Sequence, residues 1–238
     1  MSDDALFPLE LVQPGKHDAG PRLVRPGAVH VPGWLTLEQQ QWIVGRFSEW
    51  TQGPVPLRAA TLPGGHQMSV RTVCLGWHWQ PYRYSRTATD VNGQPVLDFP
   101  EWMVRLGKQA VAAAYSPDLG VEESLLGLSR DYAPDAALVN YYGDGAAMGM
   151  HQDKDEHSNA PVVSLSIGDT CIFRFGNTES RTKPYTDLEL RSGDLFVFGG
   201  PSRFAYHGIP KVLPGTAPDG CGLDRGRINI TMRVTGLS

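Results

Sequence analysis

Two stretches in the first half of the chain have the hydrophobic spacing of amphipathic helices. A helix is expected to start at Thr36, because Thr36 and Gln39 have the spacing of a capping box. Apolar side chains then recur every three or four residues on one face: Ile43, Phe47 and Trp50. The stretch 100–115 has a similar apolar face and a proline in its first turn. Both helices are predicted to pack against a core.

The second half changes to a period of two, in short runs broken mostly by Gly, Pro, Asn or Asp. The expected strands are 137–142, 162–167, 171–175, 187–190, 195–198, 204–207 and 227–234. Many short strands joined by turns predict an α+β, mainly β protein, a double-stranded β-helix (jelly roll) with flanking N-terminal helices. Residues 1–30 are expected to be an irregular arm with one short strand at 28–31, and residues 31–238 a single domain.

Composition limits the class of protein. The 238 residues are 41% hydrophobic and 19% charged, which is ordinary for a globular domain. The net charge of −4 means that contact with nucleic acid would need a local basic patch. Three scattered cysteines favour reduced thiols, and neither a leader peptide nor a membrane-spanning run is apparent. We therefore expect a cytoplasmic protein with no membrane contact and no obligate protein partner.

Residues 51–89 differ from the rest of the chain because they contain no Asp or Glu. The segment holds four arginines: Arg58, Arg71, Arg83 and Arg86. Four large aromatic residues lie between them: Trp77, Trp79, Tyr82 and Tyr84. Cations interleaved with aromatic rings are typical of surfaces that follow phosphates and stack bases. The alternative is that the rings belong to the core, but a Gly-, Pro- and Gln-rich loop is a poor place to bury four of them.

The candidate metal site begins with His151 and Asp153, which are separated by one residue. In an extended segment these side chains leave the same face. With a distant histidine they would form the 2-His-1-carboxylate arrangement that suits non-haem Fe(II). His207, at the end of an alternating run, is the expected third ligand. The alternative interpretation is a set of structural or solvated histidines, since a lone His-x-Asp is a weak signal.

The final run, 227–234, alternates strictly between apolar and polar residues. Its polar face is made of four residues: Arg227, Asn229, Thr231 and Arg233. This face could be solvated, but the planar forks of two arginines match carboxylates. Six residues of strand span about 20 Å, so the arginines are expected at opposite ends of a dicarboxylic cosubstrate and its metal. Asn140 and Tyr142 share a face on an earlier strand and could hydrogen-bond the same molecule.

Four motifs then occur in order: Asn140-x-Tyr142, His151-Gln-Asp153-Lys-Asp155-Glu, Ser202-Arg-x-x-Tyr-His207-Gly and Arg227-x-Asn229-x-Thr231-x-Arg233. Together they resemble the AlkB family of Fe(II)- and 2-oxoglutarate-dependent dioxygenases, particularly its bacterial DNA-repair members. The resemblance continues upstream through three shorter motifs: Met68-Ser69-Val70, Leu75-Gly76-Trp77 and Tyr82-Arg-Tyr84-Ser85. It therefore extends over residues 65 to 236 or so.

The resemblance implies a role for each motif. Iron would be bound by His151, Asp153 and His207. The cosubstrate 2-oxoglutarate would be bound by Asn140, Tyr142, Arg227, Asn229 and Arg233. Of the two arginines, Arg227 would pair with its distal carboxylate and Arg233 would lie nearer the metal.

The resemblance also implies a base-recognition segment at residues 62–90 or thereabouts. The substrate base would meet Met68, Trp77, Tyr82 and Asp155. The sequence departs from the family pattern between Trp77 and Tyr82, where it is two residues shorter, so Tyr84 is an alternative to Tyr82. The loop after Gly176 also differs, and Arg181 is the candidate for its substrate-contacting arginine.

The reaction implied is oxidative demethylation of N-alkylated bases such as 1-methyladenine and 3-methylcytosine in DNA. It uses Fe(II), O2 and 2-oxoglutarate and releases succinate, CO2 and formaldehyde. These lesions are cationic, so an aromatic face and the Asp155 carboxylate would favour them over neutral bases. Three alternatives remain: the same chemistry on RNA or tRNA, hydroxylation of a small metabolite, and a non-catalytic metal-binding β-sandwich, which the complete ligand set disfavours.

Overall fold

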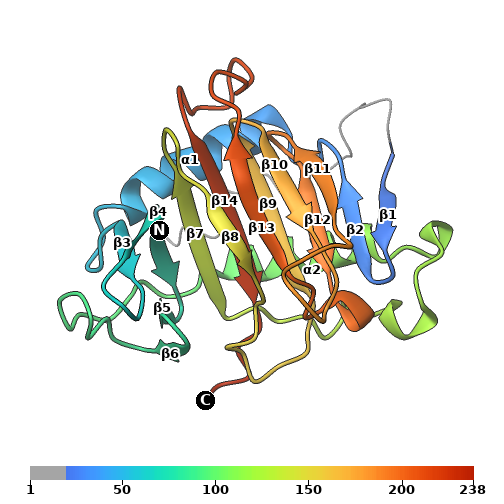
Figure 1. The fold of residues 1–238 in the computed structure, drawn as a ribbon, viewed down its shortest axis with the longest axis horizontal. Coiled ribbons are helices and arrows are strands. Elements are labelled where there is room, and N and C mark those ends of the chain that lie inside the picture. Colours follow the sequence, from blue (N-terminus) through green and yellow to red (C-terminus); the bar gives the residue numbers. More distant parts are fainter. Residues whose placement is uncertain (1–19) are drawn as a thin grey trace.

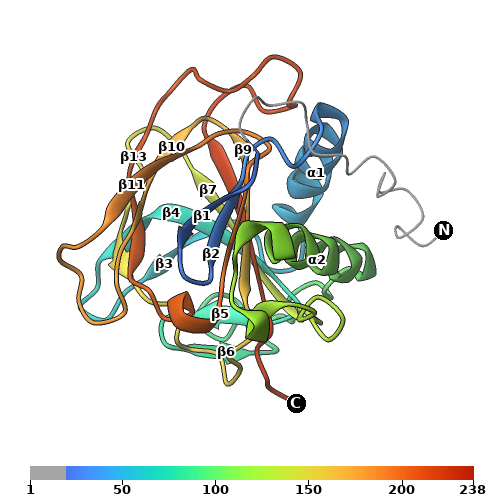
Figure 2. The same ribbon diagram turned by 90° about the vertical axis from the view of Figure 1, so that its right-hand side faces the viewer.

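The computed structural model describes residues 20–238, and its strands form two facing antiparallel sheets (Figures 1 and 2). The strands are β1 Arg22–Arg25, β2 Ala28–Val31, β3 Arg58–Thr61, β4 Gln67–Leu75, β5 His78–Gln80, β6 Arg83–Ser85, β7 Ala136–Tyr142, β8 Met148–His151, β9 Val162–Gly168, β10 Cys171–Phe175, β11 Thr186–Leu190, β12 Leu195–Phe198, β13 His207–Val212 and β14 Arg227–Arg233. The helices are α1 Leu37–Trp50 and α2 Glu101–Ala114, with short 3-10 turns at Pro117–Leu119, Glu123–Leu125 and Gly200–Ser202.

The strand order brings sequence-distant segments together, which is the jelly-roll arrangement. The larger sheet runs β1-β2-β12-β9-β14-β7-β4-β3, and the smaller runs β11-β10-β13-β8. A separate hairpin, β5–β6, lies below the end of the larger sheet in Figure 1. The predicted mainly β jelly roll is confirmed. In the larger sheet β14 lies between β9 and β7, so both of its edges are hydrogen-bonded to a neighbouring strand.

Both predicted helices are present on the outer face of the larger sheet (Figure 2). At the start of α1 the Thr36 side chain accepts from the Gln39 amide, and the Gln39 side chain accepts from the Thr36 amide. The apolar face of α1 packs on the larger sheet, where Ile228, Ile230 and Met232 of β14 are fully buried. Among the described residues, no helix has the length and apolarity that crossing a membrane requires.

The strands of the larger sheet turn one face toward the helices and the other toward the smaller sheet. Side chains of this second face help to fill the space between the two sheets. A group of four phenylalanines packs there at one end of the interior: Phe173, Phe175, Phe196 and Phe198. His207 lies against this group, with its ring centroid 5.0 Å from that of Phe198. Rigid aromatic packing therefore supports one side of the candidate metal site.

The acid-free segment is more regular than its composition suggested. Residues 58–85 hold four strands, and β4 pairs with β7 in the larger sheet. Val70, Val73 and Leu75 of β4 are buried, so burial overrides the Gly and Pro signals that favoured a loop. The larger sheet thus extends through this segment toward the site.

Two further boundaries differ from the prediction. The expected strand at 204–207 begins only at His207 and continues to Val212, because the backbone turns at residues 203–204 after the short 3-10 helix. Pro210 lies within this strand, and proline normally argues against one. Residues 1–19 of the expected arm lie outside the described residues, but β1 and β2 join the edge of the larger sheet next to β12.

Candidate active site

Three potential metal ligands meet in the smaller sheet. His151 is the last residue of β8, and it is paired directly with His207, the first residue of β13. Asp153 follows two residues after His151, and its carboxylate is buried. One ligand atom from each side chain lies within 4.8 Å of the others. Pairing of two sequence-distant strands therefore assembles the three side chains that the sequence predicted.

The hydrogen bonds of the two histidines direct their free nitrogens toward the carboxylate. His151 Nδ1 lies 3.0 Å from the Gly149 carbonyl oxygen, and His207 Nδ1 lies 3.0 Å from that of Ala205. Each Nδ1 therefore donates to a carbonyl, which leaves Nε2 with its lone pair. The Nε2 atoms lie 3.6 and 3.7 Å from the Asp153 oxygens. A backbone-fixed tautomer of this kind is typical of metal-binding histidines.

Electrostatics keep these groups in the protonation states that metal binding requires. Burial, reinforced by the neighbouring His151, lowers the pKa of His207 to about 4, so the ring is neutral at pH 7. Burial alone would raise the pKa of Asp153, but Arg233 and then His207 hold it well below its usual range. One oxygen of this carboxylate, Oδ2, is buried without a hydrogen-bond partner among the described residues. An unpartnered carboxylate oxygen beside two imidazoles whose Nε2 atoms point toward it fits a divalent cation such as Fe(II).

Arg233 is held beside the metal ligands by a buried network that the sequence did not reveal. Its Nη2 lies 2.8 Å from Asp153 Oδ1, and its Nη1 donates to Glu156 Oε1 at 3.0 Å. Glu156 also accepts from Arg203 Nη2 at 3.0 Å. Tyr84 OH donates to Glu156 at 2.6 Å and accepts from Arg233 at 2.9 Å. Glu156 directly follows the Asp153-Lys-Asp155 motif, but no local pattern indicates that it meets β14.

The polar face of β14 points into the space between the sheets and not into solvent. All four of its side chains are buried: Arg227, Asn229, Thr231 and Arg233. Asn229 is paired in register with Asn140 of β7, and its Nδ2 donates to Ser164 Oγ at 2.7 Å. Asn140 Oδ1 accepts from Thr72 at 2.7 Å. Thr72 and Ser164 belong to the same polar floor but carry no sequence signal.

Arg227 is fully buried with much of its bonding capacity unused. Its Nη2 donates to Ser166 Oγ at 2.9 Å, whereas Nε and Nη1 have no partner among the described residues. Its guanidinium lies 5.3 Å from the centre of the Tyr142 ring, and burial raises the pKa of that tyrosine so that it stays a neutral hydroxyl. A buried cation without a counter-ion is costly. The carboxylate of a bound cosubstrate would supply the missing anion.

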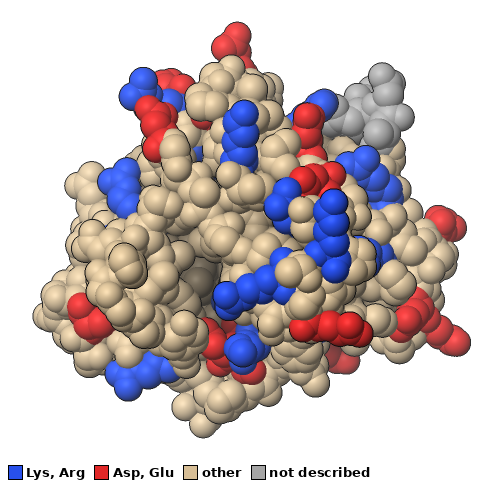
Figure 3. All heavy atoms as spheres, viewed as in Figure 1, with Lys and Arg blue, Asp and Glu red and all other residues tan. Residues whose placement is uncertain are grey.

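A cavity of about 530 Å³ opens above this floor. Its lining includes the metal triad and four of the predicted cosubstrate-binding residues: Asn140, Tyr142, Asn229 and Arg233. The fifth, Arg227, does not line the cavity but packs against the ring of Tyr142, which does. Figure 3 shows a hollow on this face of the molecule, with Lys and Arg side chains along one margin and acidic atoms at its lower edge. This size is within the usual range for small-molecule and cofactor sites.

Four of the predicted substrate-contacting residues line the same cavity: Met68, Tyr82, Asp155 and Arg181. Tyr82 is 68% exposed and has a left-handed backbone (φ 73°), which places it at the rim. Tyr84, the alternative to Tyr82, is instead tied into the Glu156 network and does not line the cavity. The structure therefore assigns different positions to the two tyrosines that the sequence could not separate.

Trp77 does not belong to the cavity, which corrects its expected position. It is 5% exposed, donates from Nε1 to Asp135 Oδ2 at 3.1 Å, and carries the Arg86 guanidinium on its ring at 3.6 Å. Trp79 lines the cavity instead, and its Nε1 donates to Asp155 Oδ2 at 2.9 Å. The sequence indicated that the segment between Trp77 and Tyr82 is shortened. That Trp79, two residues after Trp77, takes the position in the cavity wall is seen only from the geometry of β5.

The chain is similar to known proteins over most of its length. A family model described as the 2OG-Fe(II) oxygenase superfamily matches residues 27–233. The alpha-ketoglutarate-dependent dioxygenase AlkB of Escherichia coli strain K12 is 40% identical over 76% of this chain and 78% of its own. A protein named DNA N(6)-methyladenine demethylase ALKBH1D, from Arabidopsis thaliana, is 30% identical over 89% of this chain, which spans 50% of that relative's length. The solved structure of OsALKBH1 superimposes with a TM-score of 0.76 at 32% identity, covering 90% of this chain and 100% of that one.

Fold and site define the class of protein: an oxygenase that uses Fe(II), 2-oxoglutarate and O2, with the His151–Asp153–His207 cluster as the group able to bind the metal. Within that class, the chain belongs to the AlkB family of dioxygenases. The non-catalytic β-sandwich that the sequence left open is thereby excluded.

Proposed function

We propose that this enzyme removes alkyl groups from cationic bases, such as 1-methyladenine and 3-methylcytosine, in DNA. One observation carries the proposal: Trp79 and the Asp155 carboxylate are hydrogen-bonded to each other in the wall of the cavity that contains the metal triad. An aromatic face next to a carboxylate favours a flat cation over a neutral base. The DNA N(6)-methyladenine demethylase among the relatives supports DNA as the polymer, but the base that it is named for is neutral, so the preference for cationic bases rests on Trp79 and Asp155.

In this proposal the residues of the cavity, together with Arg227 next to the cavity-lining Tyr142, have separate tasks. The two histidines and Asp153 would hold the iron, and Arg227 with Asn140 and Asn229 would hold 2-oxoglutarate. Iron with its cosubstrate supplies the oxidising chemistry when bound. Trp79 and Met68 would enclose the base. Asp155 Oδ2 accepts from Trp79, so Oδ1, which accepts no hydrogen bond from the described part of the chain, would face the positive charge of the base.

The rim of the cavity favours a polymer over a small metabolite. Tyr82 is exposed there, and Arg181 and Lys154 are exposed cations that line the same opening. Such side chains are suited to the phosphates and bases next to an extruded nucleotide. An RNA or tRNA substrate would meet the same side chains, so it is the second candidate. The preference for DNA or RNA therefore depends on whether the site accepts deoxyribose or ribose.

The test is formaldehyde release from matched oligonucleotides in air, after anaerobic loading with Fe(II) and 2-oxoglutarate. DNA and RNA strands of one sequence would carry 1-methyladenine, 3-methylcytosine or the neutral N6-methyladenine. We expect turnover of the two cationic lesions in DNA to exceed that in RNA and that of N6-methyladenine. Preferred turnover of RNA would select the second candidate, and no turnover of any oligonucleotide would refute a nucleic-acid substrate.

The contribution of charge is tested by Asp155→Asn, with Asp144→Asn in the exposed turn after β7 as the matched control. Loss of the carboxylate should lower the preference for 1-methyladenine over N6-methyladenine by about tenfold, the size of a partly screened ion pair. Asp144→Asn should leave the ratio unchanged. An unaltered ratio in Asp155→Asn would remove the electrostatic part of the proposal.

A further inference from the structure

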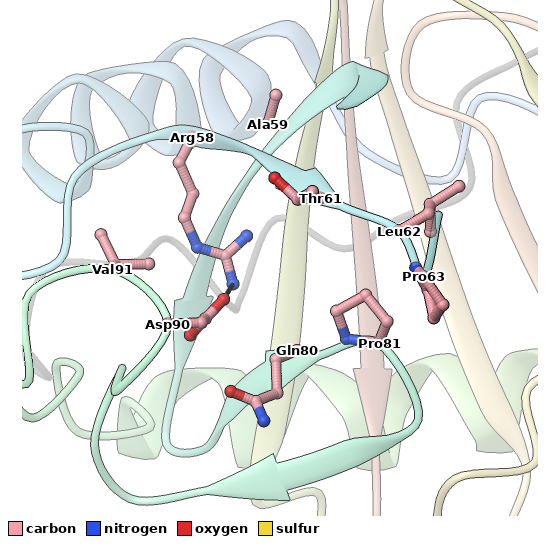
Figure 4. A pocket seen from close by; sticks show the side chains of 9 residues that line it. All are labelled: Arg58, Ala59, Thr61, Leu62, Pro63, Gln80, Pro81, Asp90 and Val91. Atoms are coloured by element: carbon pink, nitrogen blue, oxygen red, sulfur yellow. Dashed lines mark ion pairs between the residues drawn. The ribbon is translucent and has the colours of Figure 1, made fainter. Parts of the chain in front are cut away.

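A second pocket of about 350 Å³ lies beside the catalytic cavity, and Leu62 and Pro81 line both. Its wall holds the Arg58 side chain of β3 and the Asp90 carboxylate, which form an ion pair at 3.6 Å (Figure 4). The proposed function uses neither residue. Arg58 does not line the catalytic cavity, but it is hydrogen-bonded to Trp79, which does.

Arg58 Nη2 donates to the backbone carbonyl oxygen of Trp79 at 2.7 Å. The same nitrogen lies 3.0 Å from His78 Nε2, which in turn lies 2.6 Å from Asp90 Oδ1. A contact of 2.6 Å to a carboxylate requires the hydrogen to be on His78 Nε2, so that nitrogen cannot accept from Arg58. The carbonyl of Trp79 is therefore the acceptor for Arg58 Nη2, and a charged donor makes this a strong hydrogen bond.

Trp79 is thus held at three points. Its carbonyl accepts from Arg58, its amide donates to Cys74 Sγ at 3.4 Å, and its indole donates to Asp155 at 2.9 Å. The strand that carries it, β5, has only three residues and pairs only with β6. So short a hairpin is marginal by itself, which makes the tie to β3 important for the position of the indole.

We propose that Arg58 is a positioning residue: it fixes the Trp79 indole in the cavity wall and thereby sets the affinity for the alkylated base. The proposal rests on the proposed function for the nature of the ligand. The backbone of Arg58 is paired with that of Thr72 in the β3–β4 ladder, but among the described residues its guanidinium contacts only His78, the Trp79 carbonyl and Asp90. Replacing the side chain while keeping the backbone should therefore act on substrate binding and not on the metal ligands or the polar floor. The second pocket leaves room for solvent around a shorter side chain, so a variant can lose the bond without collapsing a core.

The experiment compares Arg58→Met with Arg86→Met. Arg86 is the matched control because it lies in the same acid-free segment and donates to a backbone carbonyl, that of Gly76, at 3.1 Å, outside the cavity. Protein labelled with 5-fluorotryptophan gives the first readout by fluorine NMR, with the Trp79 resonance assigned by its loss in Trp79→Phe. KM for a methylated oligonucleotide, KM for 2-oxoglutarate and succinate formation without oligonucleotide are the kinetic readouts.

In Arg58→Met the Trp79 resonance should shift or broaden, and KM for the oligonucleotide should rise roughly tenfold, the value of one charged hydrogen bond. The KM for 2-oxoglutarate and the oligonucleotide-independent succinate formation should stay within twofold of wild type, and Arg86→Met should change none of these. An unmoved Trp79 resonance, or an equal rise in KM for both substrates, would overturn the proposal. A shifted resonance in a protein whose wild type accepts no oligonucleotide would refute the proposed function and leave the positioning role supported.

Discussion

Arg227 and Arg233 leave the same face of β14, yet they meet opposite environments. Arg233 is bonded to Asp153 and Glu156, whereas Arg227 meets no carboxylate among the described residues and contacts the Ser166 hydroxyl and the Tyr142 ring. Both guanidinium groups are buried, so the difference lies in their partners. The charge of Arg233 is therefore compensated in the ligand-free protein. We propose that the charge of Arg227 is compensated when the carboxylate of 2-oxoglutarate binds.

Substituting these two arginines should change stability in opposite directions. Arg227→Met should raise the free energy of unfolding of the ligand-free protein by about 1 kcal/mol or more, because an unpaired buried charge is removed. Arg233→Met should lower it by about 3–5 kcal/mol, because Asp153 and Glu156 lose their cation. Denaturant unfolding measures both values, and a loss of stability in Arg227→Met would show that its charge is already compensated.

The metal triad makes a prediction that does not depend on turnover. Excess Co(II) with 2-oxoglutarate should raise the thermal midpoint of the wild type, since a ligand at 100 times its Kd stabilises by about 2.7 kcal/mol. His151→Ala should lose this rise because it retains only two ligands. His66→Ala, an exposed histidine in the loop before β4, should keep it. A full rise in His151→Ala would contradict the assignment of the metal site.

At the scale of elements, α1 and β14 were predictable because their signals are local. The helix has an apolar stripe and a reciprocal cap, and the strand has strict alternation over its whole length. The hairpin β5–β6 was not predictable, since its residues are held by contacts with β3 and with the segment after Asp153. Short strands without an apolar face of their own depend on such distant contacts.

The cap of α1 can be tested separately from the site. Thr36→Ala removes the side-chain acceptor for the Gln39 amide and should lower the free energy of unfolding by about 1 kcal/mol. Thr51→Ala at the other end of the helix, where the hydroxyl donates to the Ser48 carbonyl, should cost less than half of that. Equal losses would show that the capping box has no special role.

For the molecule as a whole, buried histidines link stability to pH. Burial lowers the pKa of His78 although Asp90 opposes it, and burial with His151 lowers the pKa of His207 to about 4. In the unfolded chain both would titrate near about 6.5. Below that pH the unfolded state binds more protons than the folded one, so stability falls as the pH drops toward 4.

Metal-free protein should therefore lose free energy of unfolding between pH 7 and 5, by at most about 1.4 kcal/mol per pH unit for each histidine. His78→Gln should make the dependence shallower, while His66→Gln should leave it as in the wild type. Chemical denaturation in the presence of a chelator at a series of pH values gives the slopes. Identical slopes in all three proteins would mean that His78 does not contribute.

The sequence by itself predicted the class of the fold, the three residues that cluster as potential metal ligands and the residues of the β14 face. Each of these features can be recognised from the spacing within one segment or from the order of motifs along the chain. In a strand, side chains two residues apart lie on the same face, so the residues of one face can be identified from the sequence. Asp155 and Met68 were likewise placed in the cavity by motif alone.

The three-dimensional arrangement was needed to show which aromatic residue lines the cavity and which arginine has donors without a partner among the described residues. Trp77 and Trp79 are two apart in an acid-free stretch, and nothing local distinguishes them. Contacts with Asp135 and Asp155, which lie 58 and 76 residues away in the chain, direct one indole out of the cavity and the other into its wall. Such choices are made by the register between distant strands, because a side chain's partner across a sheet is set by pairing and not by its neighbours in sequence.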